Sequence, residues 1–386
     1  MANNNDNKVL NVPPLRFPEF SGEWKMCTIG ELTTKVGSGV TPRGGEAVYK
    51  TEGHPFVRSQ NVGLGNLLLD DIAFIDEETH LRQKSTELQF NDVLLNITGA
   101  SIGRSALVDK QIVGGNVNQH VCIIRTKENL VPSFICSFLL SNYGQRQIDS
   151  FQAGGNRQGL NFEQIKSIKI TIPSKDEQIK IAKLLRAIDE RIATQNKIID
   201  KLQSLIKGLR VCCMQRNGSN NVYLSEIAQI YQPQTISSAE LTEDGFLVYG
   251  ANGIIGKYKD YNHKTEQICI TCRGNTCGMV NYTKPMSWIT GNAMVINTDK
   301  YQDKVYKKYL YHYLSAYNFN SIISGSGQPQ IVRTPLEKLK ITLPTISEQK
   351  QKAMILDKIQ DKIEINHNIL NLYILQKQYL LRQMFI

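Results

Sequence analysis

The chain has 386 residues, a length typical of two or three domains, and its 41% hydrophobic and 21% charged residues indicate a globular rather than a disordered protein. No apolar run reaches the roughly 18 residues of a membrane span, and the polar first residues lack the apolar core of a secretory signal. We therefore expect a cytoplasmic protein with eight reduced cysteines, and the net charge of +10 favours a polyanionic partner.

In chain order, the first half predicts short strands and then one long helix. β-forming runs bounded by Gly, Asn or Pro predict strands at 93–97, 121–124 and 168–172, and a helix is expected at 133–143. From Ile181 to Leu209, apolar residues recur at steps of three, four and seven, the spacing of a coiled-coil seam.

The second half predicts the same elements in the same order. Strands are expected at 268–271, 293–296 and 339–343, and a helix at 306–317. A second long helix follows, with an apolar seam from Leu356 to Leu380.

An internal repeat links the two halves. Residues 154–173 align with 325–344 at a constant shift, and the Glu-Gln pairs at 177–178 and 348–349 keep that shift. Upstream, Gly99-Ala-Ser-Ile-Gly103 echoes Gly274-Asn-Thr-Cys-Gly278, and Gly115-Asn116 echoes Gly291-Asn292. Residues 1–217 and 218–386 each carry a net charge of +5. The chain is therefore predicted to be α+β, with two copies of one domain, each followed by a long helix.

The two long helices are expected to pair antiparallel as a coiled coil. Gln195 and Asn366 interrupt the two apolar seams at the same repeat position, near the midpoint of each helix. In an antiparallel pair these amides would face each other and set the register. Ser174 and Ser347 are candidate N-caps. The alternative is that each helix packs only on its own domain.

These features resemble the specificity (S) subunit of type I restriction–modification systems over nearly the whole chain. The resemblance is carried by the opening at 14–24, Ile29-Gly-Glu-Leu32, Ile97-Thr-Gly-Ala-Ser-Ile-Gly103, Val248-Tyr-Gly-Ala-Asn-Gly253 and the doubled Pro…Glu-Gln helix entry. It implies two target-recognition domains that each bind one half of a split double-stranded DNA site, while the paired helices set the gap between the halves.

The resemblance also implies partners and a domain plan. Two methyltransferase (M) subunits would dock on the helices and domains, and restriction/translocase (R) subunits would join them. S-adenosylmethionine, ATP and Mg are expected in those partners, and no cofactor in this chain. The expected parts are an extension at 1–23, recognition domains at 24–173 and 217–344, and spacer helices at 174–216 and 345–386.

Neither catalytic residues nor a metal site are expected. The sequence has no Gly-x-x-x-x-Gly-Lys-Ser/Thr phosphate loop and no Asn-Pro-Pro or Asp-Pro-Pro motif of an amino-methyltransferase. Glu348-Gln-Lys350 matches a nuclease-like Glu-x-Lys, but it lies at the repeated helix entry and no Pro-Asp dipeptide accompanies it. Cys269, Cys272, Cys277 and His263 are a conceivable zinc set, although buried thiols explain the cysteines better.

The DNA-contacting residues are expected on glycine-rich loops, because Arg suits guanine, Asn and Gln suit adenine, and Lys and Arg suit phosphates. In the first copy the candidates are Arg43, Arg58, Ser59, Gln60, Asn61, Arg104, Asn116, Asn118, Arg157 and Gln158. In the second copy they are Asn252, Lys257, Arg273, Asn275, Asn292, Gln328, Gln330 and Arg333. For each, the alternative is a solvated loop residue or a turn-capping side chain.

Two other classes of function stay open from the sequence alone. A protein-interaction scaffold, with two binding domains on a coiled-coil rod, predicts no salt-dependent DNA affinity. An enzyme with unfamiliar motifs predicts activity from the purified chain. The duplication favours DNA, because the duplex offers two half-sites with equivalent backbones.

Overall fold

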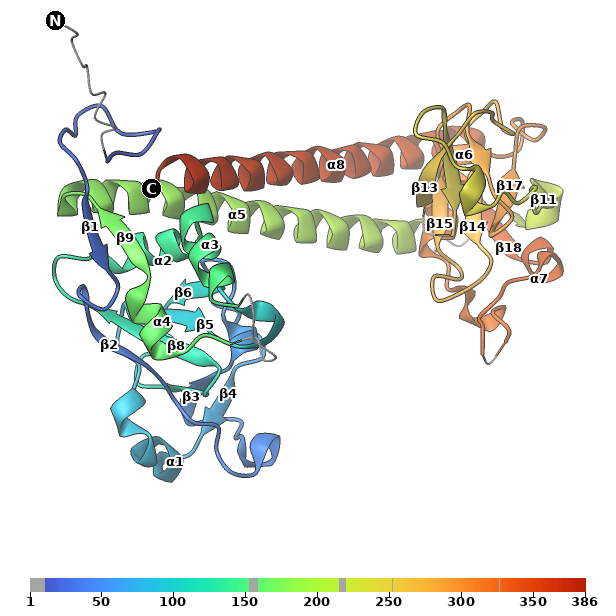
Figure 1. The fold of residues 1–386 in the computed structure, drawn as a ribbon. Helices are drawn as coiled ribbons and strands as arrows, with labels where there is room; N and C mark the ends of the chain where they lie inside the picture. Colours follow the sequence, from blue (N-terminus) through green and yellow to red (C-terminus); the bar gives the residue numbers. More distant parts are fainter. Residues whose placement is uncertain (1–10, 153–158, 215–219, 252, 326) are drawn as a thin grey trace, which may run out of the picture. The chain divides into compact units, whose positions relative to one another are not determined.

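The computed structural model describes residues 11–152, 159–214, 220–251, 253–325 and 327–386 (Figure 1). It divides into two compact units, which we call unit 1 (residues 1–196 and 369–386) and unit 2 (residues 197–368). Both unit boundaries fall inside the long helices, so each unit contains a domain and segments of both helices. Within the described part of the chain, no helix has the length and apolar character that a bilayer span requires.

Unit 1 contains three small sheets. A four-stranded antiparallel sheet has the order β2 (Thr33–Ser38), β8 (Val121–Thr126), β5 (Val93–Asn96), β6 (Ser105–Leu107). A three-stranded sheet has the order β4 (Ala73–Ile75), β3 (His54–Val57), β7 (Asn116–Val117), and β3 pairs parallel to β7. An antiparallel pair joins β1 (Lys25–Thr28) to β9 (Lys169–Ile172).

Unit 2 contains three sheets with the same topology. Its four-stranded sheet has the order β11 (Gln229–Tyr231), β17 (Ala293–Asn297), β14 (Ile268–Thr271), β15 (Val280–Tyr282). Its three-stranded sheet has the order β13 (Gly253–Tyr258), β12 (Phe246–Gly250), β16 (Trp288–Ile289), and β12 pairs parallel to β16. The antiparallel pair joins β10 (Asn220–Tyr223) to β18 (Lys340–Leu343). The duplication predicted from the repeat is therefore confirmed strand by strand.

Short helices cover these sheets, and two long helices follow them. Unit 1 has α1 (Glu77–Arg82), α2 (Pro132–Leu140), α3 (Asn142–Ser150) and α4 (Phe162–Ser167). Unit 2 has α6 (Lys307–Ala316) and α7 (Arg333–Glu337). The long helices are α5 (Lys175–Met214) and α8 (Ile346–Gln383). The helix predicted at 133–143 is instead two helices, because Ser141 ends α2 and its hydroxyl then caps α3.

In each four-stranded sheet one inner strand, β5 in unit 1 and β14 in unit 2, is buried on both faces. In β5, Val93 and Leu95 face a core that includes Phe134 and Phe138 of α2, while Leu94 faces a second core. In β14, Ile268 and Ile270 face a core with Tyr309 of α6, while the thiol of Cys269 lies in a second core. Because side chains alternate along a strand, a continuous apolar run marks a strand with cores on both sides.

The long helices run antiparallel within each unit. In unit 1, Asp189 of α5 contacts Lys377 of α8 at 2.6 Å, and Arg191 contacts Tyr373 at 3.3 Å. Residue numbers rise along one helix as they fall along the other, so the segments are antiparallel. In unit 2, Ile206 of α5 packs with Leu356 and Ile363 of α8. The alternative that each helix packs only on its own domain is therefore wrong.

The seam residues also contribute to the core of unit 1. Ile181, Leu185 and Ile188 of α5 lie in the same hydrophobic cluster as Phe134 of α2 and Phe385 after α8. Leu380, Leu381 and Met384 belong to this cluster too. The C-terminal residues therefore complete the core of the first domain.

The helix starts confirm one predicted N-cap and correct the other. Ser174 accepts a hydrogen bond from Glu177 N–H through its hydroxyl and from Gln178 N–H through its carbonyl. In the second copy Thr345 has this role, because Glu348 and Gln349 donate to it in the same way, and the predicted cap Ser347 lies inside α8. Gln195 and Asn366 are both buried, but their predicted pairing stays a prediction.

Candidate nucleic-acid interface

Two chain segments meet at one edge of each domain, and we call this feature the ledge. In unit 2 it consists of the turn 272–279, after β14, and of residues 324–325 and 327–330, before α7. Arg273 forms a β-bridge with Gln330, and Gly274 N–H donates to the Pro329 carbonyl at 3.0 Å. In unit 1, Thr98 forms the equivalent bridge with Gly159.

The ledge turn depends on glycine. Gly99 and Gly103 have φ of +72° and +83°, and their counterparts Gly274 and Gly278 have +85° and +92°. Other residues rarely adopt this left-handed region, so glycine at both positions allows the tight turn. The glycine motif recognised in the sequence is therefore a backbone requirement shared by the two copies.

In unit 2 the ledge carries four exposed polar side chains. They are Arg273, Asn275, Gln328 and Gln330. None of them forms a side-chain hydrogen bond to another described residue. A groove of about 350 Å³ lies beside the ledge, lined by Tyr231, Gln232, Arg273, Gln330 and Arg333 among others. The ledge therefore presents free donors and acceptors from a fixed backbone.

The remaining candidates in unit 2 have different surroundings. Asn292 is exposed. Arg333 pairs with Glu337 at 2.6 Å and Lys257 lies 3.5 Å from Asp244, so both cations already have acidic neighbours. Asn252 lies outside the described residues, as do Arg157 and Gln158 of the first copy.

In unit 1, two arginines are exposed and two other candidates are held by an aspartate. Arg43 and Arg104 are exposed and make no side-chain hydrogen bond to another described residue. Arg58 donates to the carbonyl and carboxylate of Asp71 at 2.7 and 3.2 Å, and Gln60 donates to the same carboxylate. Ser59 is half-buried.

Three candidate asparagines of unit 1 are buried, and their side chains form hydrogen bonds within the domain. They cannot contact a DNA base while the domain is folded. The Asn61 amide donates to the carbonyls of Leu68 and Asp71, at 2.9 and 3.3 Å. Asn118 accepts the N–H of His120 at 3.0 Å through its side chain. These asparagines thus follow the turn-capping alternative.

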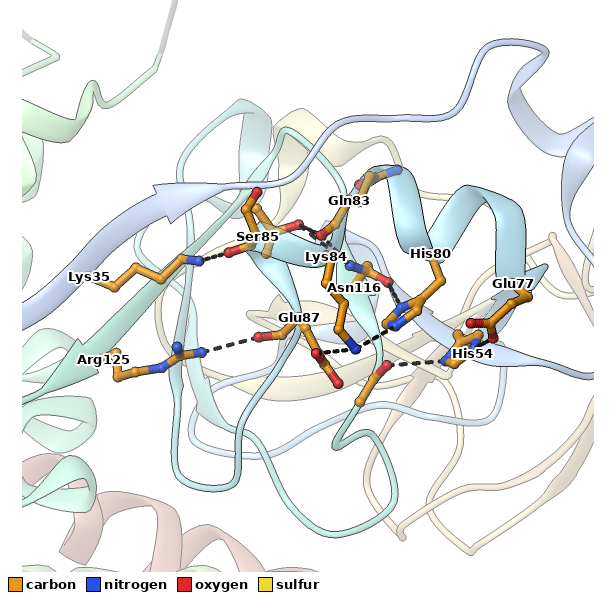
Figure 2. Close-up of polar contacts among 12 residues, drawn as sticks. Lys35, His54, Glu77, His80, Gln83, Lys84, Ser85, Glu87, Asn116 and Arg125 are labelled. Carbon is orange, nitrogen blue, oxygen red and sulfur yellow. Dashed lines mark hydrogen bonds and ion pairs between the residues drawn. The ribbon is translucent and has the colours of Figure 1, made fainter.

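Asn116 is the centre of a polar network (Figure 2). Its amide donates to the Gln83 carbonyl at 3.0 Å, and its oxygen lies 2.7 Å from His80 Nδ1. The rings of His80 and His54 stack with centroids 3.8 Å apart, and His54 Nε2 lies 2.6 Å from Glu77. Asn116 is fully buried, and its hydrogen bonds hold α1 against the three-stranded sheet that contains β7.

The predicted match of Gly115-Asn116 with Gly291-Asn292 is wrong. Asn116 pairs with Phe56 in the parallel bridge where unit 2 pairs Trp288 with Val248, so Asn116 corresponds to Trp288. The residue that corresponds to Asn292 is His120, because their carbonyls accept equivalent N–H groups, from Ile97 and Cys272. His120 is not among the DNA-contacting residues expected from the sequence, because its only signal there is its place just before a buried strand.

A model of one protein family matches both units. The family is described as "Type I restriction modification DNA specificity domain", and the matches cover residues 21–204 and 217–372. Together they span most of the chain. The chain belongs to this family.

Relatives of the same kind match this two-domain chain. The putative type I restriction enzyme MjaX specificity subunit of Methanocaldococcus jannaschii is 23% identical over 402 residues, covering 93% of this chain and 92% of that protein. The EcoprrI specificity subunit of Escherichia coli is 32% identical over 140 residues, about a third of each chain. The type I specificity subunit of M. genitalium, solved by crystallography, has a TM-score of 0.67 at 17% identity, covering 97% of this chain and 99% of that one.

The cysteines of the second specificity domain are surrounded by protein groups. Burial raises the pKa of Cys269 to about 12, and the Cys272 sulfur lies 3.2 Å from the Asn292 carbonyl. His263 Nε2 lies 2.8 Å from the Tyr231 hydroxyl. In the ranges that the structure describes, no three His, Cys, Asp or Glu side chains are grouped to hold a metal ion.

Proposed function

We propose that the chain is the DNA sequence-specificity subunit of a type I restriction–modification complex and performs no chemistry itself. In this proposal each specificity domain binds one half of a bipartite site on double-stranded DNA. The observation that carries it is the pair of ledges, which share one backbone and one glycine pattern but differ in the exposed side chains. Two copies of one domain with different polar side chains on the ledge suit two half-sites of different sequence.

The exposed candidate residues fall into two groups, those without a side-chain partner among the described residues and those that face a carboxylate. Arg273, Asn275, Gln328 and Gln330 are free to contact base edges. Arg43 and Arg104 in unit 1, and Asn292 in unit 2, are exposed and complete the set. Arg333 and Lys257 already face carboxylates, so phosphate contacts that position the domain suit them better.

The long helices are proposed to set the gap between half-sites and to dock the methyltransferase subunits. Apolar side chains stay exposed on both units. On α8 in unit 1, Leu372, Leu375 and Tyr379 are 65%, 60% and 51% exposed and recur at helical spacing along one stripe. In unit 2, Ile198 and Leu205 of α5 are exposed two turns apart. Such stripes favour burial by a partner.

The catalytic work is assigned to partner subunits. Adenine methylation with S-adenosylmethionine would belong to the methyltransferase subunits. ATP- and Mg-dependent translocation and cleavage would belong to restriction subunits. The curated relatives are named specificity subunits, which supports a non-catalytic role for this chain.

The test is co-expression of this chain with its methyltransferase subunits, followed by mapping of adenine methylation across the host DNA. The expected result is one split motif with a fixed gap, and a swap of residues 24–170 for another such domain should change one half only. If methylation does not depend on this chain, and the chain neither joins a complex nor binds DNA with salt dependence, the scaffold alternative replaces the proposal.

A further inference from the structure

The two ledges provide an internal comparison within one chain. One backbone hydrogen bond recurs in both, because Leu160 N–H donates to the Ile97 carbonyl in unit 1 and Ile331 N–H donates to the Cys272 carbonyl in unit 2. The residues that correspond to the exposed side chains of unit 2 are different in unit 1. Thr98, Ala100, His120 and Gly159 of unit 1 correspond to Arg273, Asn275, Asn292 and Gln330 of unit 2. The ledge thus keeps its backbone while its chemistry changes.

Arg273 stands on rigid support. It lies two residues after the end of β14, and Ile268, Cys269 and Ile270 of that strand are fully buried. Its guanidinium is exposed and makes no hydrogen bond or ion pair to another described residue. Arg333, across the same groove, is paired with Glu337 instead. A guanidinium whose N–H donors are free can donate two parallel hydrogen bonds to guanine O6 and N7.

Gln330 is fixed next to Arg273. Its N–H and carbonyl both bond to Ser324, at 2.8 and 2.9 Å, and it faces Arg273 across the β-bridge. Side chains opposite each other in such a pair have Cβ atoms about 4.5–5.5 Å apart, and neighbouring base pairs are stacked about 3.4 Å apart. The two side chains are therefore spaced to contact the same or adjacent base pairs. A glutamine amide recognises adenine N6 and N7.

We propose that the ledge of unit 2 reads two neighbouring purines of its half-site, a guanine through Arg273 and an adenine through Gln330. The inference rests on the proposed function and specifies which residues set the sequence of one half-site. The unit 1 ledge has no equivalent, because Thr98 Oγ1 lies 2.6 Å from His120 Nδ1 and the residue at the Gln330 position is Gly159. Unit 1 must recognise its half-site through other loops.

The experiment uses the full chain co-expressed with its methyltransferase subunits, and its readout is the methylated motif. In Arg273→Ala, one G·C pair in one half-site should become degenerate, with discrimination at that pair falling about 5- to 150-fold. Gln330→Ala should relax an A·T pair at the neighbouring position. Arg273→Lys keeps the charge but loses the bidentate fork, so it should relax the same pair while retaining most of the DNA affinity.

Arg333→Ala is the matched control, because this arginine lines the same groove but is ion-paired. It should weaken DNA binding about equally for all sequences and leave the motif unchanged. Retained association of each variant with the methyltransferase subunits shows that the fold is intact. A motif unchanged by Arg273→Ala, or relaxed in both halves, overturns the inference while the proposed function stands. A wild-type chain that specifies no split motif overturns both.

Discussion

Gln178 and Gln349 make the same three hydrogen bonds in the two units. Each side-chain oxygen accepts an N–H at the start of a short helix, from Val131 at 2.9 Å and from Tyr306 at 2.8 Å. Each side-chain amide donates to two carbonyls, one in the loop before that helix and one on the proline before the long helix. Both glutamines are 1% exposed. The repeated Glu-Gln motif therefore marks a joint between the long helix and its domain.

Replacing either glutamine by alanine should destabilise only its own unit. The substitution removes the side-chain partner of three main-chain groups, which costs about 1–3 kcal/mol of unfolding free energy. Hydrogen exchange measured by mass spectrometry resolves the two units, with faster exchange at 129–131 in Gln178→Ala and at 304–306 in Gln349→Ala. The exposed Gln376 supplies a control that should change neither region. Equal destabilisation of both units by one variant would contradict this local role.

The ion pair between Arg125 and the buried Asp92 should contribute strongly to the stability of unit 1. Arg125 donates two hydrogen bonds of 2.7 Å to the Asp92 carboxylate, which is 1% exposed. Arg125→Met leaves that carboxylate buried without its cation, which lowers the unfolding free energy by about 3–5 kcal/mol. Denaturant unfolding of Arg125→Met and of the Asp92→Leu/Arg125→Met double variant checks this predicted decrease. The double variant should recover part of the lost unfolding free energy. No recovery would show that packing, not the unpaired charge, causes the loss.

His312 should make unit 2 less stable at mildly acidic pH. Burial lowers its pKa below the ordinary value of about 6.5, although Asp357 lies 2.9 Å away, and Arg210 faces its other ring nitrogen. The folded state therefore binds protons more weakly than the unfolded state. The contribution of His312 to the unfolding free energy of unit 2 is fully present above about pH 6.5. It falls as the pH drops from there towards the pKa of His312 in the folded state.

The comparison of His312→Gln with the native chain isolates this residue. Lys308 and His263 also contribute to the charge balance of unit 2, but they are the same in both proteins. Unfolding of unit 2, followed by hydrogen exchange between pH 7.5 and 5.5, should show a weaker pH dependence in the variant. An unchanged slope would mean that His312 is not the titrating group.

The two buried amides in the long helices should set helix register. Gln195 and Asn366 are 7% and 5% exposed, and Asn366 also donates to the Lys362 carbonyl of its own helix. Replacing both by leucine should raise thermal stability but allow more than one register, because an apolar layer no longer penalises slippage. In the co-expressed complex, the mapped motif should then show more than one gap length. A single unchanged gap would indicate that the domains alone fix the register.

The downstream repeat could be predicted from the sequence because its spacing has no insertions. From the ledge bridge through the starts of α5 and α8, equivalent residues keep one constant shift. The apolar seams were equally predictable, because helical periodicity persists over many turns.

The register between the ledge turn and Asn116 was not predictable. Gly103 and Asn116 are separated by three more residues than their counterparts Gly278 and Trp288, and a short Gly-Asn match could not reveal this difference. The roles of the asparagines were hidden for a different reason. An asparagine on a glycine-rich loop has the same sequence signature whether it faces solvent, like Asn275, or holds buried backbone, like Asn61.

The placement of Leu380, Met384 and Phe385 in the core of unit 1 has a consequence for biosynthesis. The first domain leaves the ribosome early, yet the residues that complete its core are translated only after the whole of unit 2. Unit 2 is contained within residues 197–368, so its whole chain is available first. The nascent first domain must therefore wait, with an apolar face uncovered, until residues 380–385 have been translated. A stop codon just before these residues would damage the first domain and leave the chain of unit 2 intact.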